Sequence, residues 1–252
     1  MSERSAGSAP RTVVVTGGGR GIGRATCLAA ARDGWAVCVD YARDAASAEA
    51  VAAEIRAAGG TALAVQADVA EEADVVRLFE TVDRALPPLG GLVNNAGVVD
   101  RAAHIEQIDR GRLERLFAVN VFSAFACARE AVRRLKGRGG SIVNVSSVAA
   151  RLGAPGQYVD YAASKGAIDT FTTGLALELA ADGIRVNAVR PGIVDTDIHA
   201  SGGEPDRAAR LAPGIPMQRP GTAEEAAEAI VWLLSERASY STGAVLDVSG
   251  GR

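Results

Sequence analysis

Aromatic residues are scarce in this sequence of 252 residues, where they make up 4% of the chain. The formal net charge is −3, with acidic and basic residues interspersed along the chain. Proteins that bind nucleic acids usually present a basic surface and aromatic rings that stack on bases. The composition therefore argues against a nucleic-acid partner.

Residues that bind metals are also few. The chain has two histidines and three cysteines, and Cys27, Cys38 and Cys127 lie in apolar stretches without the spacing of a metal site. Such isolated cysteines are typical of reduced thiols in the core of a cytosolic protein. The sequence thus predicts no metal centre and a cytoplasmic location.

Long apolar runs are missing as well. None approaches the roughly 20 residues that cross a membrane, and residues 1–10 lack the apolar segment of a signal peptide. We expect no association with membranes and a flexible tail over residues 1–10, which are rich in Ser, Ala and Gly. Residues 11–252 suit one α/β domain, since 48% of the chain is hydrophobic.

Strand-like and helix-like segments alternate along residues 11–252. This order predicts a doubly wound Rossmann-type fold, with a seven-stranded parallel sheet, helices on both faces and the site at the carboxyl ends of the strands. The expected strands are 12–16, 36–41, 61–66, 91–94, 140–146, 184–190 and 243–248.

A glycine-rich turn follows the first expected strand and precedes a helix. In a dinucleotide site, the first glycine permits the tight turn and the later ones let the pyrophosphate and the next helix approach the backbone. The helix N-terminus then attracts phosphate. A tight connection without a ligand is the structural alternative. The predicted cofactor turn includes Gly17, Gly19, Arg20, Gly21, Ile22 and Gly23.

Tyr161 and Lys165 occur four residues apart in a helical pattern and should share one face. A nearby ammonium favours the phenolate, so we expect Lys165 to lower the pKa of Tyr161 and make it a general acid or base. Tyr158 is a rival tyrosine, but the residue four positions later is alanine. Ser146 and Ser147 end an expected strand and point to opposite faces.

Five motifs occur in one order: Thr16–Gly23, Asn94–Gly97, Ser147, Tyr161 with Lys165, and Pro191–Gly192. Together they resemble the classical short-chain dehydrogenase/reductase family from about Arg11 to the C-terminus. The resemblance implies NAD(P)-dependent hydride transfer between a carbonyl and a secondary alcohol. A dinucleotide-binding sensor or scaffold without catalysis is the alternative, because fold does not fix function.

The resemblance also implies residue roles. Tyr161 would be the general acid or base, Lys165 would bind the nicotinamide ribose, and Ser147 would bond the substrate oxygen. Asn120, in an apolar helical setting, would hold a relay water at a local distortion of the helix. Asp68 would contact the adenine, or cap the next helix. Further cofactor contacts are implied at Val69, Asn95, Ala96, Gly97, Pro191, Gly192, Val194 and Thr196.

The end of the second expected strand should choose between NAD and NADP. Tyr41 stands where the family's NAD-selecting acid would be, and Asp40, one position earlier, should face the other way. Arg20 and Arg43 could instead surround a 2′-phosphate. Ala42, between Tyr41 and Arg43, would lie beside it. We expect NADP; a one-residue shift of the loop would restore Asp40 and favour NAD.

The stretch 195–221 is rich in Gly, Pro and charge, and we expect it to form a substrate lid with a short helix at Pro205–Leu211. His199 and Met217 are candidates to line it. The lid and the Gly156–Tyr161 run resemble sugar (glucose-type) dehydrogenases, whereas other features resemble 3-oxoacyl-carrier reductases. One extra residue, relative to many family members, separates Ser147 from Tyr161.

Two long helical patterns, 112–136 and 158–181, carry apolar residues beyond one core stripe. The family typically pairs these helices across one two-fold axis and the last helix and strand across another, which implies a homotetramer. The residues expected on these surfaces are Ala124, Ala128, Val132, Phe171, Leu175, Leu179, Ile230, Trp232, Leu233 and Leu234.

Overall fold

The computed structural model describes residues 10–196, 202–204 and 206–252. In this part of the chain seven strands form one parallel sheet in the order β3-β2-β1-β4-β5-β6-β7. The β-branched and apolar runs predicted as strands form it, with ends that differ by at most two residues from those expected. The strands are β1 (Thr12–Val15), β2 (Ala36–Tyr41), β3 (Ala62–Gln66), β4 (Leu89–Asn94), β5 (Gly140–Val145), β6 (Ile184–Pro191) and β7 (Val245–Val248).

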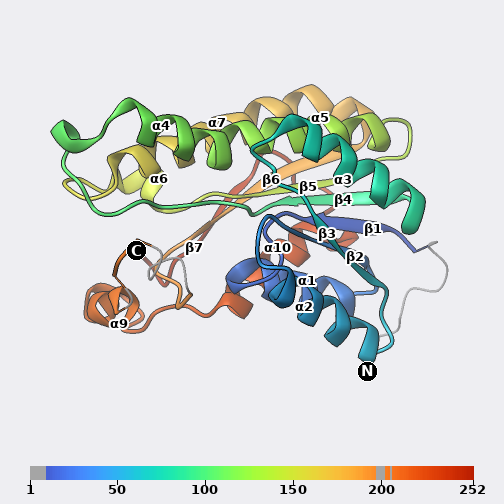
Figure 1. Cartoon of the computed structure of the whole chain (residues 1–252), viewed down its shortest axis with the longest axis horizontal. Coiled ribbons are helices and arrows are strands. Elements are labelled where there is room, and N and C mark those ends of the chain that lie inside the picture. The colour runs from blue at the N-terminus through green and yellow to red at the C-terminus, as the bar shows by residue number, and fades with distance from the viewer. Residues whose placement is uncertain (1–9, 197–201, 205) are drawn as a thin grey trace.

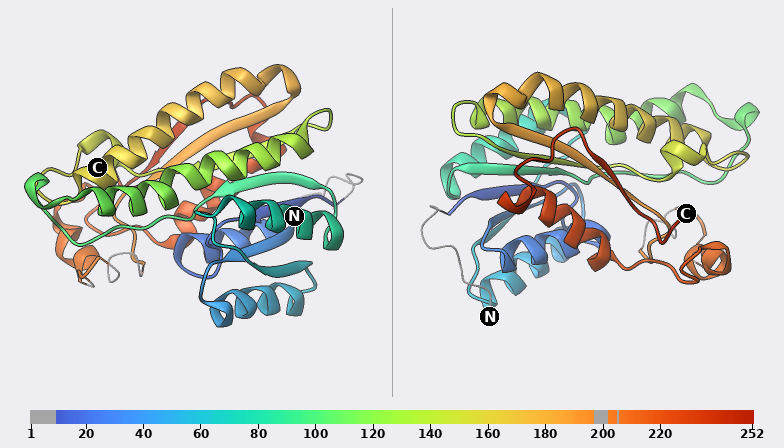
Figure 2. Two further views of the ribbon diagram at one scale, coloured as in Figure 1. Left: turned by 45° about the horizontal axis from the view of Figure 1, so that its top comes forward. Right: turned by 180° about the vertical axis from the view of Figure 1, so that it is seen from behind.

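Helices cover both faces of the sheet (Figure 1). On one face lie α1 (Gly21–Arg32), α2 (Ala45–Ala57) and α10 (Ala223–Leu234). On the other lie α3 (Glu72–Ala85), α4 (Arg110–Phe117), α5 (Ser123–Leu135) and α7 (Val159–Leu179). Both views in Figure 2 keep this three-layer order. The predicted doubly wound Rossmann-type fold is confirmed.

Strand alternation divides the core into two apolar clusters. Val13 and Val15 of β1 pack with Cys27 of α1 on one face, whereas Val14 packs with Phe79 of α3 on the other. The strand order reverses between β1 and β4, because β2 and β3 lie on one side of β1 and β4–β7 on the other. In open α/β sheets this switch point, at the carboxyl ends of the strands, is where ligands bind.

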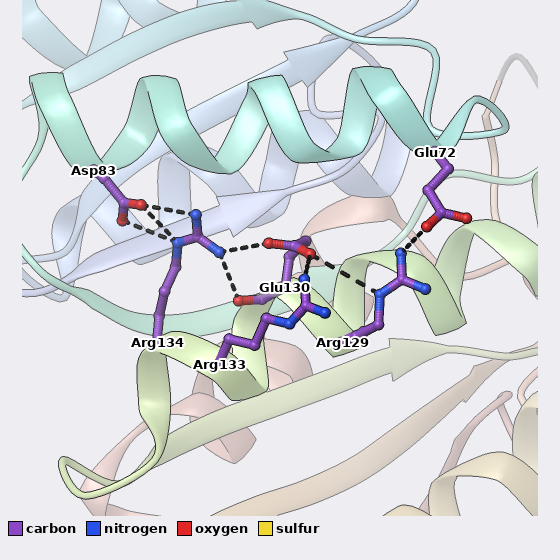
Figure 3. A network of polar contacts seen from close by, with 6 residues as sticks. All are labelled: Glu72, Asp83, Arg129, Glu130, Arg133 and Arg134. Carbon is purple, nitrogen blue, oxygen red and sulfur yellow. Dashed lines mark hydrogen bonds and ion pairs between the residues drawn. The ribbon is translucent and has the colours of Figure 1, made fainter.

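An ion-pair network joins α3 to α5 at the outer layer (Figure 3). Glu130 of α5 is buried, and its carboxylate accepts hydrogen bonds from Arg133 at 2.5 Å and Arg134 at 2.8 Å. Arg134 also donates to Asp83 of α3 at 2.8 Å, and Arg129 donates to Glu72 at 2.5 Å. Each carboxylate oxygen of this buried acid therefore pairs with an arginine.

Several expectations about surfaces need correction. Ala124, Ala128 and Leu179 are buried in the chain's own core, as are Ile230, Leu233 and Leu234, because their helix stripes face the sheet. Val132, Phe171 and Leu175 are half-buried. The large apolar side chains exposed on α5, α7 and α10 are instead Phe125, Leu177 and Trp232, and Phe122 is exposed just before α5.

The described chain also contains two short α-helices: α6 (Ala149–Leu152), which the sequence did not predict, and α9 (Arg207–Leu211). α9 falls within the short helix expected in the lid. Most of the predicted tail lies outside the described residues. No helix among the described residues is long and apolar enough to cross a membrane.

Candidate active site

The glycine turn between β1 and α1 has the conformation that the sequence predicts. Gly17 and Gly21 adopt positive φ angles of 62° and 51°, which side chains disfavour. A Cβ on Gly23 would lie 2.3 Å from the carbonyl oxygen of Gly17, so only glycine lets α1 begin this close to the turn. The N-cap residue Arg20 makes no side-chain cap bond within the described chain, and the first turn of α1 has no acid. The backbone N–H groups at the start of α1 therefore suit an anionic pyrophosphate.

Thr16, which the sequence analysis did not single out as a site residue, bonds the loop after β4 to this turn. The Thr16 hydroxyl oxygen accepts hydrogen bonds from the N–H groups of Asn95 at 3.0 Å and Ala96 at 2.9 Å. The Asn95 amide donates to the carbonyls of Thr16 at 2.9 Å and Gly17 at 3.2 Å. Asn95 therefore shapes the turn. A hydroxyl residue directly before the glycines was the available signal.

Asp40 faces inward, as strand alternation predicts. Its side-chain oxygen Oδ2 accepts a hydrogen bond from the Gly17 N–H at 3.1 Å, and only 1% of the residue is exposed. Burial raises the pKa of Asp40 to about 7, against the opposing effect of the Gly17 bond. Tyr41 is half-buried at the strand end, and Ala42 and Arg43 beyond it are exposed.

Asp68 follows β3 and is half-buried. Its carboxylate accepts from the N–H of Ala70 at 3.1 Å, while the N-cap of α3 is Glu71. The alternative that Asp68 caps α3 is therefore wrong, because α3 starts at Glu72, four residues after Asp68, and the Asp68 carboxylate bonds the preceding turn at Ala70. Val69 beside it is buried.

Asn120 lies in a π-helical turn, Ala118–Phe122, between α4 and α5. The predicted helix distortion is therefore present, and such π turns are frequent at functional sites. The Asn120 amide accepts from the Val98 N–H at 2.8 Å and donates to the Val98 carbonyl at 2.9 Å. It also donates to the Ser164 hydroxyl at 3.2 Å. The Asn120 side chain thus joins the loop after β4 to α7.

Ser147, Tyr161 and Lys165 meet where β5 ends and α7 begins. Ser147 forms a side-chain hydrogen bond with Tyr161. The Lys165 ammonium lies 5.8 Å from the centre of the Tyr161 ring and donates to the Val145 carbonyl at 2.7 Å. Ser146 is buried and its hydroxyl donates to the Lys165 carbonyl at 3.2 Å, so this serine bonds the backbone of α7.

The pKa values in this group differ from the expectation. Burial raises the pKa of Tyr161, and the opposing bond to Ser147 is the smaller effect. Burial also lowers the pKa of Lys165 to about 8, with Asp169 acting in the opposite direction. The predicted lowering of the pKa of Tyr161 by Lys165 is therefore wrong here, because desolvation of the phenolate dominates.

The Pro-Gly turn after β6 lies against the glycine turn. The Thr196 side chain stands 3.4 Å from the position that a Cβ on Gly21 would take. A Cβ on Gly192 would meet Ser249 at 2.7 Å, so the turn fits closely over the end of β7. Pro191 ends β6 itself, and Val194 forms a parallel bridge with Gly221, which joins the two ends of the expected lid.

The rival tyrosine has a different role. Tyr158 is buried, and its hydroxyl donates to Glu204 at 2.6 Å while Arg207 lies 4.9 Å above its ring. It therefore bonds the lid and not Ser147. Met217 is 60% exposed, and His199 lies outside the described residues.

Comparisons with known proteins show which family this chain belongs to. Residues 17–252 match the family model described as enoyl-(acyl carrier protein) reductase. The chain belongs to the short-chain dehydrogenase/reductase family. It is 55% identical over 243 residues to a protein named uncharacterized oxidoreductase YgfF of Escherichia coli (strain K12), covering 95% of this chain and 98% of that protein.

Two further relatives bear more specific names. A 3-oxoacyl-[acyl-carrier-protein] reductase of Synechocystis sp. (strain ATCC 27184 / PCC 6803 / Kazusa) is 39% identical, with 96% of each chain covered. A crystal structure of a dehydrogenase/reductase from Sinorhizobium meliloti 1021 superposes with a TM-score of 0.91 at 36% identity, covering 97% of this chain and 95% of that one. This short-chain dehydrogenase/reductase is therefore an oxidoreductase, and its family uses a nicotinamide dinucleotide.

Proposed function

We propose that this enzyme interconverts a carbonyl and a secondary alcohol with NADP(H), using Tyr161 as the general acid or base. The observation that carries the proposal is the meeting of Ser147, Tyr161 and Lys165 at the end of β5. This group lies on the edge of the sheet that also carries the glycine turn. A bound nicotinamide would supply or accept the hydride.

Each residue has a role that its surroundings support. The Ser147 hydroxyl would bond the substrate oxygen, and Tyr161 would give that oxygen its proton during reduction. The raised pKa of Tyr161 keeps the phenol protonated near neutral pH, which suits the donor role. Lys165, already held by the Val145 carbonyl, would bond the nicotinamide ribose. Asn120 would hold the adjoining loop and α7 in place.

The choice of NADP rests on the end of β2. The Asp40 carboxyl is buried against Gly17, so it cannot also reach a ribose hydroxyl on the outside of the turn. Arg20 and Arg43 are both exposed beside this strand end. A 2′-phosphate would pair with their guanidinium groups by charge-assisted hydrogen bonds. Tyr41 and Ala42 would line the adenosine side, with Asp68 and Val69 near the adenine.

For the substrate we propose a 3-oxoacyl ester or thioester, because a relative of 39% identity is named a 3-oxoacyl-[acyl-carrier-protein] reductase. We also propose that the enzyme acts in the cytoplasm as a homotetramer. Its three cysteines are all buried and free, which suits a reducing compartment. Phe125 and Leu177 give α5 and α7 the exposed apolar surface that a partner helix would cover.

The test is a substrate panel on the purified full-length chain, with NADPH and NADH in parallel. Ethyl acetoacetate and acetoacetyl-coenzyme A represent 3-oxoacyl groups, a 3-ketosteroid represents bulky ketones, and glucose oxidation with NADP⁺ represents the sugar reading. We expect fastest turnover of a 3-oxoacyl compound with NADPH. Tight NADPH binding without turnover of any compound would favour the non-catalytic alternative.

A further inference from the structure

A buried ion pair lies directly beside the proposed proton donor. Asp160 is the second residue of α7 and precedes Tyr161, and the Arg112 Nε donates to its Oδ2 at 2.6 Å. The Asp160 side chain is 1% exposed and the Arg112 side chain 10%. Neither residue belongs to the motifs that carry the family resemblance.

Arg112 also forms a hydrogen bond to the loop that follows β4. Its Nη1 donates to the carbonyl of Arg101 at 2.7 Å, and the backbone N–H of Arg112 is fixed by the N-cap Asp109 at 2.7 Å. One guanidinium therefore joins three elements: α4, the first turn of α7, and the loop that runs on from the cofactor-binding segment 95–97.

A second set of bonds closes a ring around Tyr161. The Ser164 hydroxyl donates to the Tyr161 carbonyl at 2.7 Å and accepts from the Asn120 amide at 3.2 Å. Asn120 in turn holds the same loop at Val98. The first turn of α7 is thus tied to this loop on two sides, once through Asn120 and once through Asp160 and Arg112.

The ion pair between Arg112 and Asp160 is expected to contribute little to the stability of the fold. Within the described chain, Arg112 Nη2 and Asp160 Oδ1 are buried without a hydrogen-bond partner. Buried ion pairs often contribute less than apolar residues of the same volume, and incompletely bonded ones contribute still less. What an apolar pair could not provide is a directional link between α7 and the Arg101 carbonyl.

We propose that Arg112 and Asp160 form a positioning pair, which fixes the first turn of α7 so that the Tyr161 phenol stands opposite Ser147. The proposal rests on the proposed role of Tyr161. Arg112 and Asp160 touch neither substrate nor cofactor in this account; they act through the backbone of α7. Loss of the pair should therefore affect the chemical step and leave cofactor binding at the glycine turn intact.

The test uses Arg112→Lys and Asp160→Asn in the full chain. A lysine keeps the charge but cannot reach both Asp160 and the Arg101 carbonyl, and an asparagine keeps the shape of Asp160. The same helix offers matched controls: Arg110 pairs with Glu114 at 2.6 Å on the exposed face of α4, so Arg110→Lys and Glu114→Gln make the same chemical changes away from α7.

The first readout is the reduction of ethyl acetoacetate with NADPH. Because a small misplacement of a catalytic group can cost up to about 100-fold, we expect kcat to fall roughly 10- to 100-fold in both test variants. The Kd for NADPH should stay within about twofold, and the controls should match the wild type. Unchanged kcat in Arg112→Lys, or an equal loss of NADPH affinity, would overturn the proposal.

The second readout needs no turnover. Ultraviolet difference titration against the matching Tyr161→Phe protein isolates the tyrosinate signal of Tyr161, whose pKa burial raises. Ser147 and Lys165 face this phenol, and Asp169 acts on Lys165. Arg112→Lys changes no charge, so a displaced, more exposed phenol should titrate at lower pH, closer to the ordinary value. The control Arg110→Lys should leave the titration unchanged.

The two readouts separate the possible failures. If wild type reduces no carbonyl compound, the proposed function fails, while the titration still decides whether the pair positions Tyr161. A Tyr161 titration that is the same in wild type and Arg112→Lys contradicts the positioning role. Should one single variant fail to fold, the double variant Arg112→Gln with Asp160→Asn, which removes both charges together, is titrated in its place.

Discussion

The carboxyl group of Asp40 accepts a hydrogen bond from the backbone N–H of Gly17 at 3.1 Å, beneath the turn that would hold the cofactor phosphates. The Asp40 carbonyl also accepts from the Gly18 N–H at 2.8 Å. The acid at the end of β2 is therefore a structural anchor of the glycine turn. Its other oxygen, Oδ1, is buried without a partner among the described residues, which makes ionisation unfavourable.

This burial predicts a pH-dependent stability. The folded-state pKa of Asp40, about 7, lies above its unfolded value, so the folded chain binds the extra proton. The stabilisation is complete below about pH 4 and is lost as the pH rises through 7, by on the order of 4 kcal/mol at most. Asp40→Asn keeps an acceptor for Gly17 and does not titrate.

We therefore expect the stability of Asp40→Asn relative to wild type to increase between about pH 5 and pH 8. Urea unfolding of both proteins across this range measures the difference. The exposed Asp33, which pairs with Arg237 at the surface, provides the control variant Asp33→Asn. A constant difference between Asp40→Asn and wild type at all pH values would contradict the assignment.

A second prediction separates the two neighbouring tyrosines. Tyr161→Phe should retain NADPH binding but lose roughly 10²–10⁴-fold in kcat, because a positioned acid–base group is worth about that much. Tyr158→Phe is the matched control: it removes a hydroxyl that bonds Glu204, so kcat should change only a few-fold. Steady-state reduction of ethyl acetoacetate measures both. Near-normal turnover by Tyr161→Phe would show that another group supplies the proton.

Much of the fold could be predicted because local patterns determine it. β1 is a run of β-branched residues and β2 is apolar up to Asp40. The glycines that follow β1 require a turn, so the first βαβ unit needs no long-range information. The face of the sheet to which the Asp40 side chain points follows from the alternation of side chains along β2 alone. The weaker predictions concerned surfaces: Ala124 and Leu179 belong to apolar stripes, but only the packed structure shows that those stripes face the sheet.

The site was predictable only where a motif marks it. Arg112 and Asp160 are 48 residues apart, and an acid in the first turn of a helix normally indicates a solvated residue that favours the helix dipole. The rise in the pKa of Tyr161 could not be predicted either. The direction of this shift depends on how far burial outweighs the opposing bond to Ser147, which is a property of the assembled site.

The choice of cofactor gives a third prediction. Arg43→Ala and Arg20→Ala should each weaken NADPH by roughly 10- to 100-fold, the worth of one charged hydrogen bond, and weaken NADH much less. Arg24 of α1 is also exposed but pairs with Glu54 at 2.7 Å, so Arg24→Ala should leave the ratio of the two affinities unchanged. Fluorescence titration gives all the Kd values. Tighter binding of NADH than NADPH by wild type would refute the NADP assignment.

The close approach of α1 to the glycine turn gives a fourth prediction. In Gly23→Ala the new Cβ would meet Gly17 oxygen at 2.3 Å and Asn95 nitrogen at 2.6 Å, so the turn must move. We expect a loss of roughly 1–3 kcal/mol and weaker NADPH binding. Gly174 is the control, because a Cβ there meets nothing within 4 Å in the described chain.

In the interior of α7, Gly174→Ala should stabilise the protein by about 0.5–1 kcal/mol and leave NADPH binding unchanged. Urea unfolding and fluorescence titration compare the two variants. If Gly23→Ala bound NADPH as wild type does, the turn would not depend on this close packing.

The final prediction concerns assembly. Phe125 of α5 is 50% exposed and stacks on Phe171 of α7 with ring centroids 4.0 Å apart, and Leu177 of α7 is 78% exposed. Trp232 of α10 is 38% exposed on a different face. Two separate apolar surfaces on one chain suit two kinds of two-fold contact and hence a homotetramer.

Light scattering at micromolar concentration should give the tetramer mass. Phe125→Glu places a charge in only one of these surfaces and should reduce the mass to that of a dimer, whereas Arg110→Lys should not. A monomeric wild type would refute the prediction, and a wild-type dimer would leave a single interface.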